Sequence, residues 1–475
     1  MAASLRDRIG AALFAPVDVA SLVAFRVCFG LLMAWEGQNL LTSGAATKWM
    51  GYGFRFSYPG FSWVQMWPGD GFYLHVYALI ALALCIAAGL FYRAACALFA
   101  LGFAYVFLLD EAFYLNHFYL ICLLAGAMAF LPAHRAFSLD AMLRPSLRAE
   151  TIPAWPVWLL RAQMGLVYFF GGVAKLDADW LAGRVLEGSA ISVLPYPYLQ
   201  DFFAQPWVAV AMAWGGLLLD LLVVPALLYR PTRPFALAAA IGFHLMNHHI
   251  WHIGVFPWLA IAATLLFLDP DWPRRVFHWP RRTPREDAPP FAWNRRRAVV
   301  AIALAAYLAV HLALPLRHLL YPGRASWTEE GQAFAWRMMQ RQKTAFVIFK
   351  LEDPRSGRSW LVDPARELAL HQAKAMAKHP RLLHRYALHL AELTEQAEGV
   401  RPVVKAYSAV VLNGRHPAPL VSPTVDLAAL PLRALGHADW ILPREGNPLA
   451  DDPDWLEVMR ELRAGFAESW GLPPR

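Results

Sequence analysis

Nine apolar segments, each close to the length of a membrane-crossing helix, follow one another through the first two thirds of the chain. A helix needs about 20 apolar residues to cross about 30 Å of hydrocarbon. Of the 475 residues, 58% are hydrophobic, more than in an ordinary soluble domain. We therefore expect a polytopic α-helical membrane protein with about eight or nine transmembrane helices. The predicted spans lie near residues 20–42, 72–92, 94–110, 113–131, 153–174, 206–229, 234–250, 253–269 and 298–320.

Basic residues are distributed unevenly between the two ends of these spans. With nine spans and a cytoplasmic N-terminus, sixteen Lys and Arg residues fall in cytoplasmic segments and four in outer loops. Half of the sixteen lie within residues 270–297. Because short loops rich in Lys and Arg stay in the cytoplasm, this bias places the N-terminus inside and the C-terminal region outside. The excess of basic residues that gives the net charge of +8 therefore serves to orient the protein in the lipid bilayer. We expect no nucleic-acid partner.

The C-terminal third has a different character, with charged residues throughout and no further apolar span. "TAFVIFKLEDPRSGRSWLVD" predicts two strands around a polar turn, and "RPVVKAYSAVVLNGRHPAPLV" predicts a second hairpin around Asn413 and Gly414. The segment between them has helical periodicity with a break at Pro380. We expect two domains, a transmembrane domain over 1–320 and an extracytoplasmic α/β cap over 321–475.

Three separate segments carry polar side chains to the outer ends of predicted spans. Lys175 closes the fifth span, Asn116 and His117 open the fourth, and His244 and Asn247 lie near the end of the seventh. A single lysine or histidine at such a depth is typical of an interfacial anchor or a hydrogen-bond partner. Their convergence at one depth favours an active site, because clusters of ionisable groups in membranes tend to be functional. The histidine spacing is not that of a standard metal site, so we expect no metal.

Two further features concern the interior of the predicted bundle. Gly171 and Gly172 precede Lys175 by one turn, where they favour close approach of either a neighbouring helix or a flat ligand. Arg161 and Asp220 lie roughly 12 to 14 Å from the inner end of their spans. Since an unpaired charge at that depth is costly, we expect a structural ion network that joins them, with Arg26 as a possible third member.

Motifs along almost the whole chain resemble one family of membrane proteins. The longest are "VYFFGGVAKLDADWLAG" and "FHLMNHHIWHIGVFPWLAIAATLLFLDPDWPRR". Shorter matches are "SLVAFRVCFGLLMAWE", "YLNHFYL", "WTEEGQAFAWRMMQRQK" and "VSPTVDLAALP", in the same order as in the family. The chain resembles the vitamin K-dependent gamma-carboxylases and their bacterial relatives, the horizontally transferred transmembrane (HTTM) domain proteins. The resemblance implies a bacterial inner-membrane location.

The resemblance also implies a reaction, that of a peptidyl-glutamate 4-carboxylase. Reduced vitamin K of the menaquinol or phylloquinol type is deprotonated and reacts with O2, and so generates a base strong enough to remove the γ-proton of a peptidyl glutamate. CO2 then adds to the γ-carbon, and the quinone leaves as an epoxide. Lys175 falls on the family's catalytic lysine, His117 on the histidine that supports the chemistry, and Asn116 on its neighbour. A lysine at an apolar helix end suits the first deprotonation, because burial disfavours the charged ammonium form.

Within this interpretation, other residues acquire expected roles. Gly171, Gly172, His244 and Asn247 would contact the quinone with Asn116. Met338 and Met339 would line its apolar pocket with flexible thioethers. Trp336, Arg341 and Lys343 would bind the acidic glutamate-containing peptide. The alternative for this cap segment is an amphipathic helix that packs the cap against the bundle.

The chain departs from the animal enzymes at two points, and two other function classes stay open. Ala174 precedes Lys175 where the animal enzymes carry two adjacent lysines, and residues 321–475 contain no cysteine for an interdomain disulfide. One alternative is a related quinol-dependent membrane enzyme that does not carboxylate glutamate. The other is a non-enzymatic membrane protein or transporter, although no inverted repeat with paired broken helices is visible.

Overall fold

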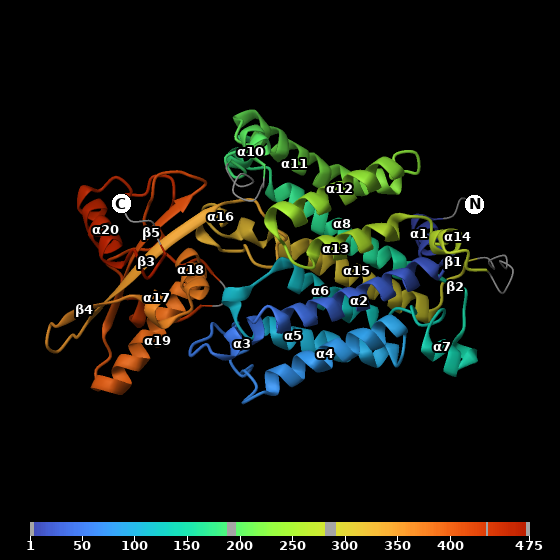
Figure 1. Ribbon diagram of the computed structural model, residues 1–475, viewed down its shortest axis with the longest axis horizontal. Coiled ribbons are helices and arrows are strands. Elements are labelled where there is room, and N and C mark those ends of the chain that lie inside the picture. The colour runs from blue at the N-terminus through green and yellow to red at the C-terminus, as the bar shows by residue number, and fades with distance from the viewer. Residues whose placement is uncertain (1–3, 188–195, 281–290, 434–435, 472–475) are drawn as a thin grey trace.

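A bundle of long helices continues at one end into a smaller α/β cap (Figure 1). The computed structural model describes residues 4–187, 196–280, 291–433 and 436–471. The elements of the bundle are α1 (Leu5–Phe14), β1 (Pro16–Asp18), α2 (Ala20–Thr42), α3 (Ala45–Met50), α4 (Gly71–Ala88), α5 (Tyr92–Leu108), η1 (Glu111–Phe113), α6 (Asn116–Met128), α7 (Leu139–Leu143), η2 (Pro145–Leu147), β2 (Thr151–Pro153), α8 (Trp155–Ala174), α9 (Ala178–Leu181), α10 (Pro197–Phe203), α11 (Pro206–Leu228), α12 (Arg233–Trp251), α13 (Phe256–Thr264), η4 (Leu265–Phe267), α14 (Trp272–Val276), α15 (Arg295–Leu316) and η5 (Arg317–Leu320). Those of the cap are α16 (Ala325–Thr328), β3 (Lys343–Glu352), β4 (Ser359–Val362), α17 (Pro364–Glu367), α18 (Leu370–Lys378), α19 (Pro380–Glu398), β5 (Val403–Leu412), η6 (Leu427–Ala429) and α20 (Pro453–Phe466).

Each of the nine predicted spans contains a helix. Within the described residues, five helices are long and apolar enough to cross a membrane: α2, α4, α8, α11 and the helix over Arg295–Leu320. Three further apolar helices are shorter, namely α5, α6 and Phe256–Phe267. The prediction of a helical membrane protein is therefore confirmed, whereas the count of eight or nine spans stays a prediction.

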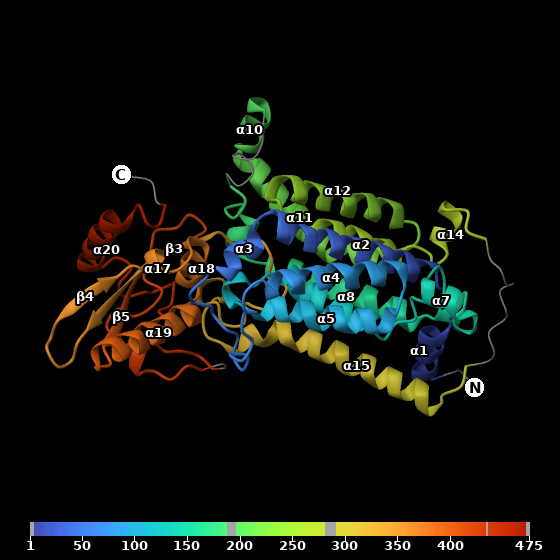
Figure 2. The ribbon, with the colours of Figure 1, turned by 60° about the horizontal axis from the view of Figure 1, so that its bottom comes forward.

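The bundle helices lie roughly alongside one another (Figure 1), and the contacts of α11 with α8 and with α12 position the site. α2 packs against α4, and the two lie side by side in Figure 1 and Figure 2. A Cβ on Gly30 would lie 2.5 Å from the Ala87 backbone nitrogen, so glycine permits this close approach. On the other side of the bundle α8 packs against α11, and α11 against α12. The polar ends of α8 and α12 are thereby brought close together.

The cap is a three-stranded antiparallel sheet covered by helices. Its strand order is β4-β3-β5, and α18 packs against β3. Pro380 lies in the first turn of α19, where its missing N–H has no helical partner to lose, and Gly399 ends that helix with a φ of 70°. The first predicted hairpin is confirmed as β3 and β4. Of the second, β5 forms as predicted, and its return segment pairs through the Val410–Ala418 bridge.

The bundle and the cap interlock. Phe56, from the outer loop after α3, is fully buried in the cap core beside Trp327. In the opposite direction, Trp336 belongs to the apolar core of the bundle although it follows residue 320. The proposed domain boundary at residue 320 thus stays a prediction, and side chains cross it in both directions.

The predicted ion network of Arg26, Arg161 and Asp220 is wrong. The guanidinium of Arg161 donates to the Leu266 and Leu268 carbonyl oxygens, at 2.7 and 3.0 Å. Arg26 donates to the Ala133 carbonyl at 3.0 Å and to the Phe137 carbonyl at 2.5 Å. Carbonyl groups near helix ends lack intrahelical partners and can accept hydrogen bonds from cations. The depth of a residue in its predicted span does not show whether such a carbonyl group is within reach. Asp220 pairs instead with Lys175.

Candidate active site

A cavity of about 260 Å³ lies where the bundle meets the cap. It is lined by residues of α6, α8, α11 and α12 and by the cap segment around residue 338. Eight of the residues singled out from the sequence line it together: Asn116, His117, Lys175, Asp220, His244, Asn247, Met338 and Met339. Aromatic side chains form much of the remaining wall, among them Tyr168, Trp180, Phe243, Trp251 and Phe256. The cavity therefore combines an apolar surface with a few convergent polar groups, as small-molecule sites do.

Lys175 is the cation of this cavity's bundle side, and it is paired. It forms the C-cap of α8 and is 5% exposed. Its Nζ lies 2.5 Å from Oδ2 of Asp220 and 3.1 Å from the Gly171 carbonyl oxygen. The ammonium also lies 5.3 Å from the centre of the Trp180 ring. Because both groups are buried, a charge on either one depends on the other for compensation.

Gly171 and Gly172 make this pairing sterically possible. A Cβ on Gly172 would lie 2.7 Å from Cδ2 of Leu221, and a Cβ on Gly171 would lie 3.2 Å from Oδ2 of Asp220. The two glycines thus let α11 approach α8 closely enough for Asp220 to reach Lys175. Within the described residues, neither glycine is among those that line the cavity, so the structure favours packing over the predicted contact with a quinone.

Asn116 and His117 enter the cavity from the first turn of α6. The Tyr114 hydroxyl donates to Oδ1 of Asn116 at 3.0 Å and accepts a hydrogen bond from the Phe334 backbone N–H at 2.6 Å. The imidazole of His117 packs near the rings of Phe118 and Phe256. It makes no hydrogen bond within the described part of the chain, which leaves its ring nitrogens for a ligand.

His244 belongs to a buried chain of polar groups that the sequence analysis did not identify. Its Nε2 lies 2.7 Å from the Tyr168 hydroxyl, which lies 3.3 Å from Oγ1 of Thr264. The opposite ring nitrogen, Nδ1, is buried without a partner among the described residues. Tyr168 precedes Lys175 by seven residues, about two helical turns, and this spacing was a usable signal that both lie on one face of α8.

The cap segment over residues 334–339 has an unusual backbone. Phe334, Trp336 and Met339 all have positive φ, at 60°, 55° and 53°. Such conformations are costly for bulky residues and occur where the surroundings enforce them, often at functional sites. The segment is therefore not the amphipathic helix considered as an alternative. It presents Met338 and Met339 to the cavity.

Three predicted peptide-binding residues occupy other positions. Trp336 is 1% exposed and stacks on Tyr119 at 5.0 Å, so its ring is part of the bundle core. Arg341 and Lys343 both pair with Glu329, at 2.6 and 2.9 Å. The prediction that these three side chains bind an acidic peptide is therefore not supported, because one is sealed in the core and two are neutralised within the cap.

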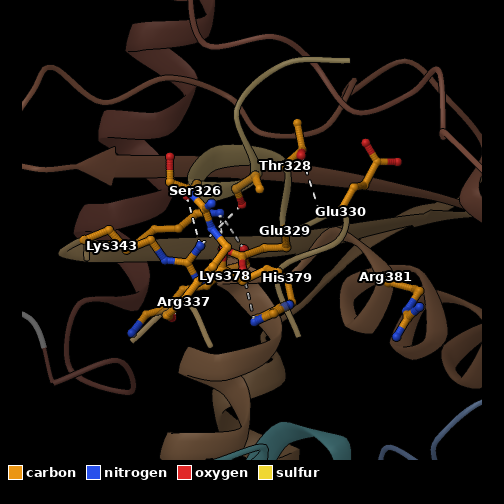
Figure 3. Close-up of polar contacts among 12 residues, drawn as sticks. Ser326, Thr328, Glu329, Glu330, Arg337, Lys343, Lys378, His379 and Arg381 are labelled. Carbon is orange, nitrogen blue, oxygen red and sulfur yellow. Dashed lines mark hydrogen bonds and ion pairs between the residues drawn. The ribbon is translucent and has the colours of Figure 1, made fainter. Parts of the chain in front are cut away.

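Glu329 organises this buried charge cluster (Figure 3). Burial alone would raise the pKa of Glu329, but the charges of Arg341, His379 and Lys343 outweigh it and lower the pKa to about 2. Burial lowers the pKa of Lys343 to about 8. The Lys343 ammonium also donates to the Trp327 and Lys378 carbonyl oxygens, at 2.5 and 2.7 Å. The cluster joins α16, β3 and the end of α18.

Asp179, four residues after Lys175, ties the cap to the loop that carries the lysine. Its carboxylate accepts hydrogen bonds from Arg415 Nη2 at 2.5 Å, from Asn413 Nδ2 at 3.1 Å and from Arg184 Nη1 at 3.0 Å. Burial would raise the pKa of Asp179, but the Arg415 and Asn413 hydrogen bonds outweigh it and lower the pKa to about 2. Asp177 caps α9 by accepting a hydrogen bond from the Asp179 N–H at 2.9 Å.

Comparison with known proteins adds two family matches. Residues 14–272 match the HTTM domain, and residues 296–447 match the lumenal domain of vitamin K-dependent gamma-carboxylase. No solved structure matches the chain. The first match covers more than half of the chain and contains Lys175, Asp220, His117 and His244, whereas the second contains the cap segment that closes the cavity. The chain therefore belongs to the HTTM family, and the match of residues 296–447 agrees with the resemblance to the gamma-carboxylases that the sequence motifs carry.

Proposed function

We propose that this protein is an integral-membrane carboxylase that adds CO2 to the γ-carbon of peptidyl glutamate. It would use reduced naphthoquinone and O2 and release the quinone epoxide and water. The observation that carries this proposal is the buried Lys175–Asp220 pair, which opens into a cavity between a lipid-embedded bundle and a cap. The family matches support the same reaction class.

The pair is suited to accept the first proton. Lys175 in its amine form takes a proton from a bound hydroquinone hydroxyl, and the ammonium that results lies 2.5 Å from the Asp220 carboxylate. Attraction between opposite charges is far stronger in a buried site than in water, so Asp220 favours this proton transfer. The neutral-amine role of Lys175 remains a prediction that mutagenesis must test.

The cavity fits a flat, apolar quinone with polar oxygens at its edge. Its aromatic and methionine walls suit a fused ring system. His244, whose Nδ1 has no partner among the described residues, and His117 both line the cavity, and they are the candidates to hydrogen-bond ligand oxygens. When bound, the hydroquinone supplies the reducing power and, with O2, the strong base. The protein orients it and excludes water.

The arrangement of the bundle and the cap provides separate routes for the quinone and the peptide. A lipid quinone enters from the bilayer between helices, whereas the peptide arrives at the cap. In agreement with the distribution of basic residues, we propose a cytoplasmic N-terminus and an extracytoplasmic cap in a bacterial inner membrane. Of the basic 270–297 loop that orients the protein, residues 281–290 lie outside the described residues.

The proposal is tested with membranes that contain the protein, a glutamate-rich peptide, reduced menaquinone and labelled bicarbonate. We expect label in the peptide, and we expect Lys175→Ala to abolish it. Lys48→Ala, which removes an exposed lysine from α3, is the matched control. Quinol consumption without peptide labelling would instead indicate the related quinol-dependent enzyme, and no reaction would overturn an enzymatic role.

A further inference from the structure

Arg337 is a second cation at the cavity, and it comes from the cap. It lines the same cavity as Lys175 and Asp220 and lies between Trp336, which is buried in the bundle core, and Met338. The backbone on both sides is fixed by the left-handed residues Trp336 and Met339. A guanidinium carried by such a segment has a defined position relative to the cavity.

The partners of Arg337 are neutral amides. Its Nε donates to Oε1 of Gln332 at 3.0 Å, and its Nη2 lies 3.5 Å from Oε1 of Gln340. Gln332 and Gln340 are themselves buried, at 9% and 3% exposure. These contacts hold the plane of the guanidinium and leave Nη1 without a partner within the described residues.

No carboxylate among the described residues lies within 4.0 Å of the Arg337 guanidinium. Two other cations of the same cap segment, Arg341 and Lys343, share Glu329. Burial, followed by the nearby charge of Arg341, lowers the pKa of Arg337, and the more distant charges of Asp177 and Glu329 offset this lowering only in part. A guanidinium in this condition attracts an anionic ligand, and Nη1, with two N–H groups and no partner among the described residues, is the nitrogen that can donate to a carboxylate.

We propose that Arg337 binds the γ-carboxylate of the glutamyl substrate. The inference rests on the proposed function and names the residue that selects its substrate. A hydroquinone oxygen offers one acceptor and enters from the bundle, whereas a side-chain carboxylate offers two and arrives from the cap, where Arg337 is attached. The site therefore holds the two substrates between Lys175 on one wall and Arg337 on the other.

The same contact assists the chemistry. When the Cγ–H bond breaks, the proton passes to the base generated from reduced naphthoquinone and O2. The electron pair left on Cγ spreads onto the adjacent carboxylate oxygens and then forms the new bond to CO2. Negative charge on those oxygens thus increases in the transition state, and a guanidinium already in place stabilises it more strongly than it stabilises the bound substrate.

The test compares Arg337→Gln and Arg337→Lys with the wild-type protein, all as full-length protein in membranes. We expect the KM for a glutamate peptide to rise about 10- to 100-fold in Arg337→Gln, as for loss of a charge-assisted hydrogen bond, and to rise more than the KM for quinol. Arg337→Lys keeps the charge but not the paired donors, so we expect an intermediate defect. Arg324→Gln is the matched control, because Arg324 is half-exposed and pairs with Asp177 and Glu445 on the surface.

A direct binding measurement, without quinol, separates this inference from the proposed function. Detergent-solubilised wild-type protein should bind a glutamate peptide more tightly than the matching glutamine peptide, and Arg337→Gln should abolish that preference. If wild-type protein carboxylates the peptide but Arg337→Gln and Arg337→Lys keep the preference, the role of Arg337 is wrong. If the preference depends on Arg337 but no carboxylation occurs, the carboxylate site stands and the proposed function fails. If Arg337→Gln does not fold, the same binding measurement on Arg337→Lys decides whether the preference depends on this residue.

Discussion

Replacing Glu329 by Gln should destabilise the cap strongly while changing its shape little. Gln has the same size but no charge, so the change removes the single carboxylate that Arg341, Lys343 and His379 approach at 2.6, 2.9 and 3.4 Å. The side chain of Arg341 is 16% exposed and so keeps some access to water, whereas the side chain of Lys343 is only 2% exposed. The ammonium of Lys343 would then keep two backbone carbonyls and its contact with the Trp327 ring, but no described carboxylate.

Two considerations give a similar magnitude. Removing one partner of a buried ion pair typically costs about 3 to 5 kcal/mol. Independently, a carboxyl whose pKa falls from 4.5 to about 2 on folding stabilises the folded state by roughly 3 kcal/mol at neutral pH. This contribution is fully present above the unfolded pKa, near pH 4.5, and is lost as the pH falls toward about 2. We therefore expect a loss of about 3 kcal/mol or more in Glu329→Gln.

Hydrogen exchange of the purified full-length protein measures this loss locally. Protection of the β3 and β5 amides should fall about 100-fold or more in Glu329→Gln, if they exchange through opening of the cap. Glu398→Gln, which removes a surface partner of Arg358, should change protection little. Adding Lys343→Met to Glu329→Gln should restore part of the protection, because it removes the stranded ammonium. Unchanged protection in Glu329→Gln, or a further loss in the double variant, would refute the reasoning.

Three other experiments test the site and the orientation of the protein in the membrane. Lys175→Arg should be as inactive in quinol-dependent turnover as Lys175→Ala, since a guanidinium stays protonated and cannot accept the proton; substantial activity would exclude the lysine as the base. Asp220→Asn should lower kcat by about 100-fold, the usual scale for loss of one electrostatic partner in an active site, while the protein remains inserted in membranes; an unchanged kcat would assign the pair a structural role only. In sealed inner-membrane vesicles with the cytoplasmic face outward, protease should spare the cap over residues 321–475, and rapid digestion there would reverse the proposed topology.

The polar residues of the cavity were predictable because each lies at the end of an apolar segment. Span boundaries and the alternation of sides place Asn116, Lys175 and His244 at one depth, and the structure brings all three to one cavity. What a depth does not give is the direction in which a side chain leaves its helix. For this reason Asp220 was assigned to Arg161, although α11 turns it toward Lys175.

The cap segment shows a different limit of sequence reasoning. From the sequence alone, the same interpretation, a cation near the membrane, applies to Arg337, Arg341 and Lys343. Their roles diverge because Glu329, in the preceding turn, reaches two of them and not the third. Three left-handed bulky residues in this segment were equally unpredictable, since local propensity opposes them and only contacts with the bundle and the cap enforce them.

Asp179 gives a physical reason why the two parts of this chain belong to one site. Lys175 ends α8, and Asp179, four residues later in the short helix α9, is bound by Arg415 and Asn413 of the cap. Asn413 is in turn joined to the cap segment through Gln342, whose backbone N–H donates to Asn413 Oδ1 at 2.8 Å. The wall that carries Lys175 and the wall that carries Arg337 are therefore linked through a short series of charged and backbone hydrogen bonds. A displacement of the cap would move both walls of the cavity, so the position of the base depends on how the cap is seated.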